Sequence, residues 1–170
     1  LTLHAAILDN AVHAIIATTP EGIITVFNRA AEDMLGYQAD EIIGKQSPDI
    51  FHDPDGLEKR AEAFSEQLGI PVTPGFDTII VKSRNNKPNE HEWLYRRKDG
   101  SAIPVLLSVS TMRNVDRMIS GYLGIAVDIG KLKKVEQALL DSEMRFRTIF
   151  EKASIGMAFA DAEGNLLQTN

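Results

Sequence analysis

The chain has 170 residues, 44% of them hydrophobic, so it can form one complete domain with further chain left over. Its formal net charge of −6 leaves no basic face, which argues against nucleic acid and anionic membrane surfaces as partners. It contains no cysteine, which excludes disulfides, thiolate nucleophiles, Cys-ligated metals and cysteinyl adducts to a chromophore.

No stretch approaches the roughly 18 consecutive apolar residues of a membrane span, and no segment has the pattern of a signal peptide. We therefore expect a cytoplasmic chain that makes no membrane contact of its own. Because it begins at Leu1 and ends at Asn170 within predicted structure, we expect it to be a piece of a longer protein.

The first 53 residues predict two strands among short helices. Asn28 is a good N-cap, and Gly36 can end the helix that Asn28 begins. Pro48 suits the first position of a later helical turn. The expected elements are a helix at 3–12, strands at 14–19 and 23–27, a helix from 28 to 35, a short helix at 40–43 and a helical turn from 47.

The clearest helix is predicted at 54–68, with Asp53 as its cap and Gly69 at its exit. Its apolar residues fall at spacings of four, three and four, which makes one buried stripe of Leu57, Ala61, Phe64 and Leu68. The segment at 70–89 is rich in proline and polar residues. We expect an extended loop there, with at most one strand at 78–82.

Three further strands are predicted at 90–98, 102–113 and 119–129, and Asp99-Gly100 is a strong hairpin signal between the first two. Five strands with helices inserted after the second predict an α+β fold, an antiparallel sheet with helices on one face. In the last strand, Gly124 and Ala126 alternate with the bulky Leu123, Ile125 and Val127. If the small residues face inward, they leave room for a ligand.

From residue 130 the apolar residues recur at alternating spacings of three and four, as in a helix with a heptad repeat. This seam consists of Leu132, Val135, Leu139, Ser142, Phe146, Ile149 and Ala153. This pattern favours a two-stranded parallel coiled coil over 130–153, and therefore a homodimer. A helix packed on its own domain is the alternative.

The end of the chain repeats its beginning. A shift of 142 positions aligns 7–28 with 149–170 without a gap, and five of these 22 positions are identical, Glu21-Gly22 with Glu163-Gly164 among them. We interpret 154–170 as the start of a second copy of the domain.

Several motifs now resemble the PAS domain family. They are Gly22-Ile-Ile-Thr-Val-Phe-Asn28, Ala30-Ala-Glu-Asp-Met-Leu-Gly-Tyr37, Glu41-Ile-Ile-Gly44, Arg97-Lys-Asp-Gly-Ser101 with Pro104-Val105, and Gly121-Tyr-Leu-Gly-Ile-Ala-Val-Asp-Ile129. Residues 52–55 with the loop 70–76 resemble the sensory PAS domains found ahead of histidine kinases and diguanylate cyclases. The resemblance implies a PAS fold, a signal-input role and dimerisation, with the output activity elsewhere.

The resemblance also implies a junction at which the sheet passes signals to the exiting helix, here Asp128, Ile129 and Gly130. The family usually has threonine where this chain has Gly130, and glycine loosens the backbone there. The expected organisation is a PAS domain at 1–129, a connector helix at 130–153 and the start of a second PAS domain at 154–170.

In PAS domains the ligand lies between the long helix and the inner face of the sheet. The corresponding candidates here are Phe51, Leu57, Phe64, Trp93, Tyr95, Val105, Leu107, Val109, Gly124 and Ala126. A filled core without a ligand is equally compatible with these residues, and the domain would then serve only as a dimerisation and spacer module.

The ligand or cofactor remains unknown. Haem would need His52, which lies off the stripe of the long helix, and Trp93 is the only feature that hints at a non-covalent flavin. The histidines show no metal-site spacing, and we expect no metal. Without a phosphate loop, a nucleophile motif or a carboxylate with a partner base, we expect no enzymatic activity in this segment. The sequence favours a sensor domain in signal transduction, such as a two-component system.

Overall fold

The computed structural model describes residues 8, 10–152, 158–163 and 165–169, and it divides the chain into two compact units, Leu1–Gly130 and Lys131–Asn170. The predicted N-terminal helix falls mostly outside the described residues. Leu8 is helical, but 10–12 form a turn and a bend, so the helix ends earlier than predicted.

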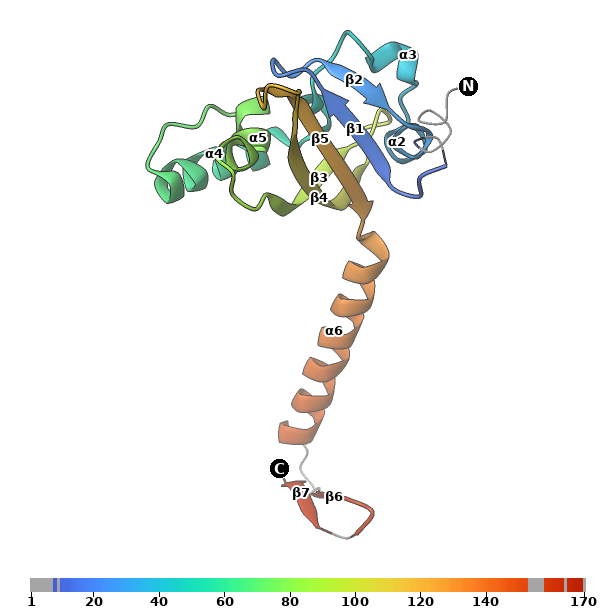
Figure 1. The fold of residues 1–170 in the computed structure, drawn as a ribbon. Coiled ribbons are helices and arrows are strands. Elements are labelled where there is room, and N and C mark those ends of the chain that lie inside the picture. The colour runs from blue at the N-terminus through green and yellow to red at the C-terminus, as the bar shows by residue number, and fades with distance from the viewer. Residues whose placement is uncertain (1–7, 9, 153–157, 164, 170) are drawn as a thin grey trace. The chain divides into compact units, whose positions relative to one another are not determined.

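The first unit is built on a five-stranded antiparallel sheet, as predicted (Figure 1). The strands are β1 (Ala14–Thr18), β2 (Ile24–Phe27), β3 (Glu90–Arg96), β4 (Ala102–Arg113) and β5 (Ile119–Asp128), in the spatial order β2-β1-β5-β4-β3. Strand β5 is therefore central and pairs with both β1 and β4. The Asp99-Gly100 turn joins β3 to β4 as expected.

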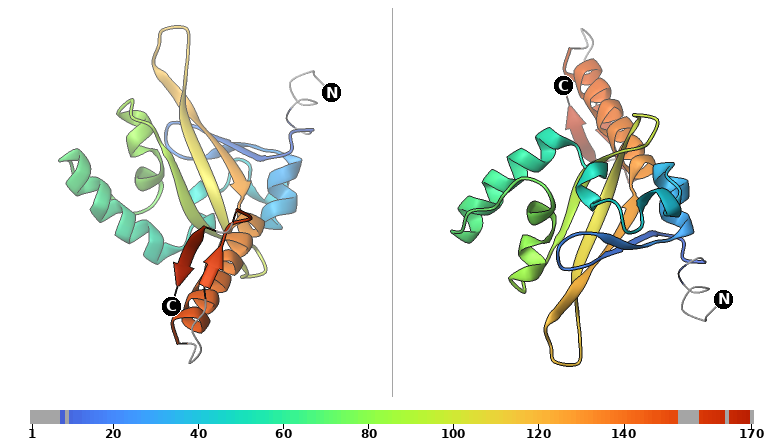
Figure 2. Two further views of the ribbon diagram at one scale, coloured as in Figure 1. Left: turned by 90° about the horizontal axis from the view of Figure 1, so that it is seen from below. Right: turned by 90° about the horizontal axis from the view of Figure 1, so that it is seen from above.

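The helical elements between β2 and β3 share one hydrophobic core with the sheet. They are α2 (Arg29–Leu35), α3 (Ala39–Ile42), the 3₁₀ turn η1 (Pro48–Phe51), α4 (Pro54–Leu68) and α5 (Phe76–Arg84). The predicted caps are confirmed, because the side chain of Asn28 accepts from the Ala31 N–H and that of Asp53 accepts from the Gly56 N–H. Helices α4 and α5 lie side by side (Figure 2).

Helix α5 corrects the expectation for 70–89, where the prediction of an extended loop with a strand at 78–82 is wrong. The run Thr78-Ile-Ile-Val81 favours a strand by propensity, but all residues from Thr78 to Ser83 are buried. A helix enclosed on nearly all sides needs no polar face, so its sequence lacks the amphipathic period that would reveal it. Ser83 Oγ anchors the helix by donating to the Val109 carbonyl of β4, at 2.8 Å.

Helix α6 (Gly130–Lys152) begins at the last residue of the first unit and continues in the second. The second unit also contains the antiparallel pair β6 (Ala158–Ala160) and β7 (Leu166–Thr169). The helix agrees with the one predicted from residue 130. The strand pair has the order expected for a second copy of the domain, whose identity stays a prediction. No helix among the described residues is long and apolar enough to cross a membrane.

Gly121 allows β5 to approach β1 closely. A Cβ atom at this position would lie 2.0 Å from the Thr18 carbonyl oxygen. We expect Gly121→Ala to lower the free energy of unfolding by about 1–3 kcal/mol, because the two strands must separate locally. Urea denaturation measures the change. The control is Gly56→Ala in α4, whose added Cβ would meet nothing nearer than 3.7 Å; equal midpoints for the two variants would contradict this account.

Candidate ligand-binding site

Neighbouring strands place their inward side chains in register across the centre of the sheet. Gly124 of β5 stands opposite Ile16 of β1 and Val109 of β4. One step along, Ala126 stands opposite Leu107. Because the central strand contributes only a hydrogen atom and a methyl group here, its bulkier neighbours enclose a space that they do not fill.

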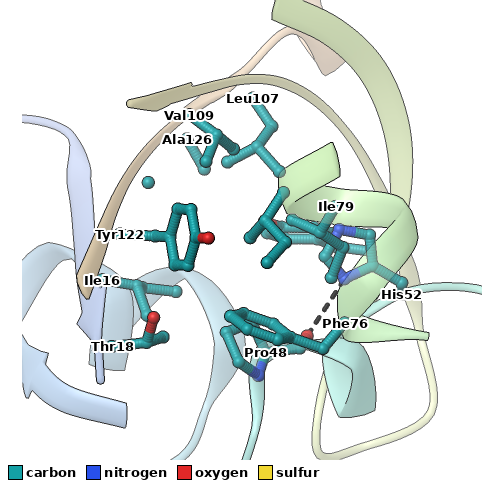
Figure 3. Close-up of a pocket in the computed structure, with 13 residues that line it drawn as sticks. Ile16, Thr18, Pro48, His52, Phe76, Ile79, Leu107, Val109, Tyr122 and Ala126 are labelled. Atoms are coloured by element: carbon teal, nitrogen blue, oxygen red, sulfur yellow. Dashed lines mark hydrogen bonds between the residues drawn. The ribbon is translucent and has the colours of Figure 1, made fainter. Parts of the chain in front are cut away.

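This space is a cavity between the sheet, η1 and α5 (Figure 3). Its volume is about 20 Å³, enough for a molecule the size of a water. The cavity is lined by Ile16, Thr18, Pro48, His52, Phe76, Ile79, Ile80, Tyr95, Leu107, Val109, Tyr122, Gly124 and Ala126. Almost all of this lining is apolar, so the few polar groups decide what can bind.

Two of the polar atoms in this lining have no hydrogen-bond partner among the residues that the structure describes. Thr18 Oγ1 and His52 Nε2 are buried, and their residues are only 3% and 2% exposed. A buried polar group without a partner costs roughly 1–3 kcal/mol. Two such atoms in one cavity are expected where a bound ligand makes the hydrogen bonds that the protein does not.

His52 is held as a neutral imidazole. Its Nδ1 lies 3.0 Å from the Pro48 carbonyl oxygen, so Nδ1 carries the hydrogen and Nε2 is left as an acceptor. Burial lowers the pKa of His52 to about 4. The ring is fixed further by edge contacts with Trp93 and Tyr95, each with ring centroids 4.7 Å apart. The site therefore offers an acceptor and no charge.

Tyr122 adds a hydroxyl group on the opposite side of the cavity. Figure 3 shows this hydroxyl turned toward the centre. Burial raises the pKa of Tyr122, so the group stays protonated and can donate. Its ring also makes an edge contact with Phe76, with centroids 5.8 Å apart. Phe76 in turn packs on Gly22, where an added Cβ would clash with the ring.

The structure brings half of the predicted pocket residues to this cavity, namely Tyr95, Leu107, Val109, Gly124 and Ala126. The small residues of β5 do face inward. Phe51, Leu57, Trp93 and Val105 lie in the main core but do not line the cavity. Phe64 belongs to a separate cluster with Ala61, Val72 and Val81, because α5 lies where the sequence predicted a loop.

Sequence reasoning missed the contribution of η1 and α5 to the cavity, made by Pro48, His52, Phe76, Ile79 and Ile80. The Ile79-Ile80 pair could have been found as a buried helix segment. The sequence singled out His52 as the residue that haem would need, and in the structure its ring is hydrogen-bonded to the Pro48 carbonyl. Its position in the cavity wall depends on the folding back of η1, for which the sequence carries no signal.

Neither haem nor flavin fits the site as it stands. Pockets for ligands of that size usually have volumes of roughly 300–1,000 Å³. The cavity has about 20 Å³, although His52 Nε2 is an available ligand atom. The described residues also contain no cluster of three or more metal-ligating side chains.

The predicted signal junction comes directly after β5, the central strand of the sheet. Asp128 ends β5, and its Oδ1 accepts a hydrogen bond of 2.7 Å from the Gly130 N–H at the start of α6. The Ile129 N–H donates to the Pro104 carbonyl of β4. The carboxylate of Asp128 thus caps the helix and restrains the glycine that the family pattern does not have.

Comparisons with known proteins agree with this fold. A PAS domain family profile matches residues 12–131. The bacterioopsin transcriptional activator of Halobacterium salinarum is 30% identical over 123 residues, which are 72% of this chain and 16% of the activator. The chain therefore spans about a sixth of that relative. Because the profile covers most of the chain, the chain belongs to the PAS domain family.

Two solved PAS domains are also similar. One, from a Colwellia psychrerythraea protein, has a TM-score of 0.60 and 25% identity, covering 75% of this chain and 95% of its own. The other, from an HTR-like protein of Haloarcula marismortui, has a TM-score of 0.50 and 25% identity. The match covers 74% of this chain and 88% of that one. PAS domains are sensory and not catalytic.

The neutral His52 predicts how stability depends on pH. Its folded-state pKa of about 4 lies below the usual 6.5, so the unfolded chain binds more protons between these values. The stabilisation is complete above pH 6.5 and is lost as the pH falls toward 4, by up to roughly 1.4 kcal/mol per pH unit. We expect His52→Phe to reduce the slope of unfolding free energy against pH in this range, while His91, whose pKa burial also lowers to about 4, supplies the remaining slope.

The control for this measurement is His13→Gln, which alters an exposed histidine. That variant should retain the slope of the unaltered protein. Equal slopes in His52→Phe and His13→Gln, measured by denaturation at several pH values, would show that His52 is not buried as a neutral ring.

Proposed function

We propose that this PAS domain is the signal-input domain of a larger signal-transduction protein and that it senses a small molecule in the cavity beside β5. The observation that carries the proposal is the presence of two unpartnered polar atoms, Thr18 Oγ1 and His52 Nε2, in one apolar cavity. The cavity lies against β5, the strand that leads into α6, and this position supports a role in signalling.

The polar atoms define the class of ligand. His52 Nε2 accepts, so the ligand must present a donor, and Thr18 Oγ1 can take either role. The apolar walls and the neutral histidine favour an uncharged molecule. A ligand of more than one or two non-hydrogen atoms requires Phe76 and α5 to move outward, because the cavity has only about 20 Å³.

Transmission would begin at Gly124 and Ala126, where a ligand contacts the central strand directly. A ligand shifts an equilibrium between two conformations only as far as its affinity for them differs. A displacement of β5 changes the Asp128 cap and the Ile129 bond to β4, and with them the start of α6. We therefore assign Asp128, Ile129 and Gly130 as the signal junction.

We further propose that α6 pairs with its counterpart in a homodimer. The predicted seam residues Leu132, Val135, Leu139, Phe146 and Ile149 are between 48% and 67% exposed, which is unusual for so many large apolar groups. The output domain would follow in the longer protein, a histidine kinase or diguanylate cyclase, after a second PAS domain that begins at 154–170. A cytoplasmic location suits this arrangement.

A spacer module with a filled core is the second candidate. The small size of the cavity favours it, because a space of about 20 Å³ can be a packing defect or hold one structural water. In that case the domain would dimerise and separate other domains without sensing anything.

Thr18→Val separates the two functions. Valine keeps the shape and removes the unpartnered hydroxyl, so for a spacer it should raise the free energy of unfolding by about 1 kcal/mol. For a sensor, native mass spectrometry of the gently purified protein should show an added small mass that Thr18→Val reduces severalfold. The matched control, Thr25→Val, alters an exposed threonine that bonds to the Ala17 carbonyl. No added mass in any of the three proteins would refute the sensor.

Leu139→Asp tests the dimer. A carboxylate at the centre of the seam cannot be buried without a partner, so we expect the dimer to become a monomer in light scattering. Gln137→Asp introduces the same charge at the outermost heptad position and should leave the dimer intact. If Leu139→Asp has the same mass in solution as the unaltered chain, α6 does not form the dimer.

A further inference from the structure

A groove between α4, α5 and β3 gathers positive charge outside the cavity described above. Among the residues that line it are Lys59, Arg60, Phe64, Lys82 and His91. Three of these side chains are cationic, although the chain as a whole has a formal net charge of −6. We refer to it as the cationic groove.

Lys82 is the most unusual residue of the cationic groove. It is only 8% exposed, and within the described part of the chain no carboxylate lies at ion-pair distance from its Nζ. The ammonium group lies 4.4 Å from the centroid of the Phe64 ring, a contact worth up to about 2 kcal/mol. The stem of Lys82 is buried while its ammonium group still reaches solvent, so the charge is placed to meet an anion that enters the groove.

The charged groups that act on Lys82 are cations as well. Burial lowers its pKa, and Arg60 and Lys87 lower it further. Arg60 stacks 4.2 Å above the Trp93 ring and donates to the Glu92 carbonyl oxygen. The Glu92 charge acts on Arg60 and is not among the groups that shift the pKa of Lys82.

His91 completes the groove on the β3 side. Its ring lies 5.1 Å from that of Phe64, and its Nε2 is buried without a hydrogen-bond partner. Burial, with Lys82 and Arg60, lowers the pKa of His91 to about 4, so the ring is neutral at pH 7 and can present one N–H. Two cations and a neutral donor, carried by three elements, thus lie around the Phe64 ring.

We propose that the cationic groove binds an oxyanion, a phosphate or carboxylate group, held by Lys82 and Arg60 with His91 beside them. The anion takes the place of the counterion that Lys82 lacks, and its several oxygens can accept from all three side chains. The bound anion would connect α4, α5 and β3. Because α5 also contributes Ile79 and Ile80 to the internal cavity, the anion is placed to influence that cavity from outside.

Thermal unfolding of the whole chain, with sodium phosphate, sodium acetate and sodium chloride at equal ionic strength, tests the proposal. We expect phosphate or acetate to raise the melting temperature in a saturable way that chloride does not match. A response to phosphate alone identifies a phosphate site, and a response to acetate alone identifies a carboxylate site. The His91 imidazole signals in NMR spectra should shift over the same concentration range.

Lys82→Met is the decisive variant, because methionine keeps most of the apolar stem and removes the charge. It should fold as the unaltered chain does in chloride and bind the anion at least tenfold more weakly. Lys45→Met is the control, because Lys45 is exposed, lies outside the groove and bonds to the Asp40 carbonyl. If Lys82→Met does not fold, Arg60→Met replaces it. Equal responses to chloride and to both oxyanions, or an undiminished response in the groove variant, would overturn the proposal.

Discussion

The position of β5 at the centre of the sheet is the constraint on which the rest of the structure depends. Strand β5 hydrogen-bonds to β1 on one side and to β4 on the other, so its position relative to both neighbours is fixed. Gly121 permits the close approach to β1, and Gly124 and Ala126 leave space on the inner face. The same strand then leads through Asp128 into α6.

The cavity is therefore a consequence of strand pairing and not of a missing element. A glycine in a strand usually weakens it, because it gives up entropy and packs nothing. Here the cost is increased by two polar atoms that find no partner inside the protein. A core selected for stability alone would have valine in place of Thr18 and alanine in place of Gly124. The retention of polar atoms beside an under-filled strand agrees better with a binding role than with a purely structural one.

Helix α5 occupies an intermediate position between the two sites. Its Ile79 and Ile80 reach the internal cavity, whereas Lys82 reaches the cationic groove. Ser83 and Asn89 fix its C-terminal end, since Asn89 Nδ2 donates both to the Ile79 carbonyl and to Ser83 Oγ. At its other end, Gly75 has a φ of 117° and no side-chain cap. That end is held instead by Asp77, which accepts from the Thr73 N–H, and by Thr78, which donates to the Thr73 carbonyl.

Local patterns in the sequence were sufficient to predict the sheet and α4. Alternation identified β4 within its observed bounds, and Asp53 with Gly69 identified both ends of α4. The small residues of β5 also indicated which of its faces is turned inward. Helix α5 could not be predicted in this way, because its burial comes from tertiary contacts that override the strand preference of Thr78-Ile-Ile-Val81.

The candidate site was predicted in part for the same reason. The residues that the sheet contributes to the cavity follow from the alternation of inward and outward side chains along β4 and β5, which is a local property. The helical side of the cavity depends on how η1 and α5 fold over the sheet. The residues expected there, Leu57 and Phe64, belong to α4 and lie in the core away from the cavity. Thr18 was not singled out, since a threonine near a strand end carries no sign that its hydroxyl lacks a partner.

A high-resolution crystal structure of the chain, purified without denaturation, tests the central claim most directly. The account predicts electron density in the cavity, within hydrogen-bond distance of Thr18 Oγ1 or His52 Nε2 and too large for a single water. A cavity with no such density, with Thr18 Oγ1 turned to a backbone carbonyl, would contradict it.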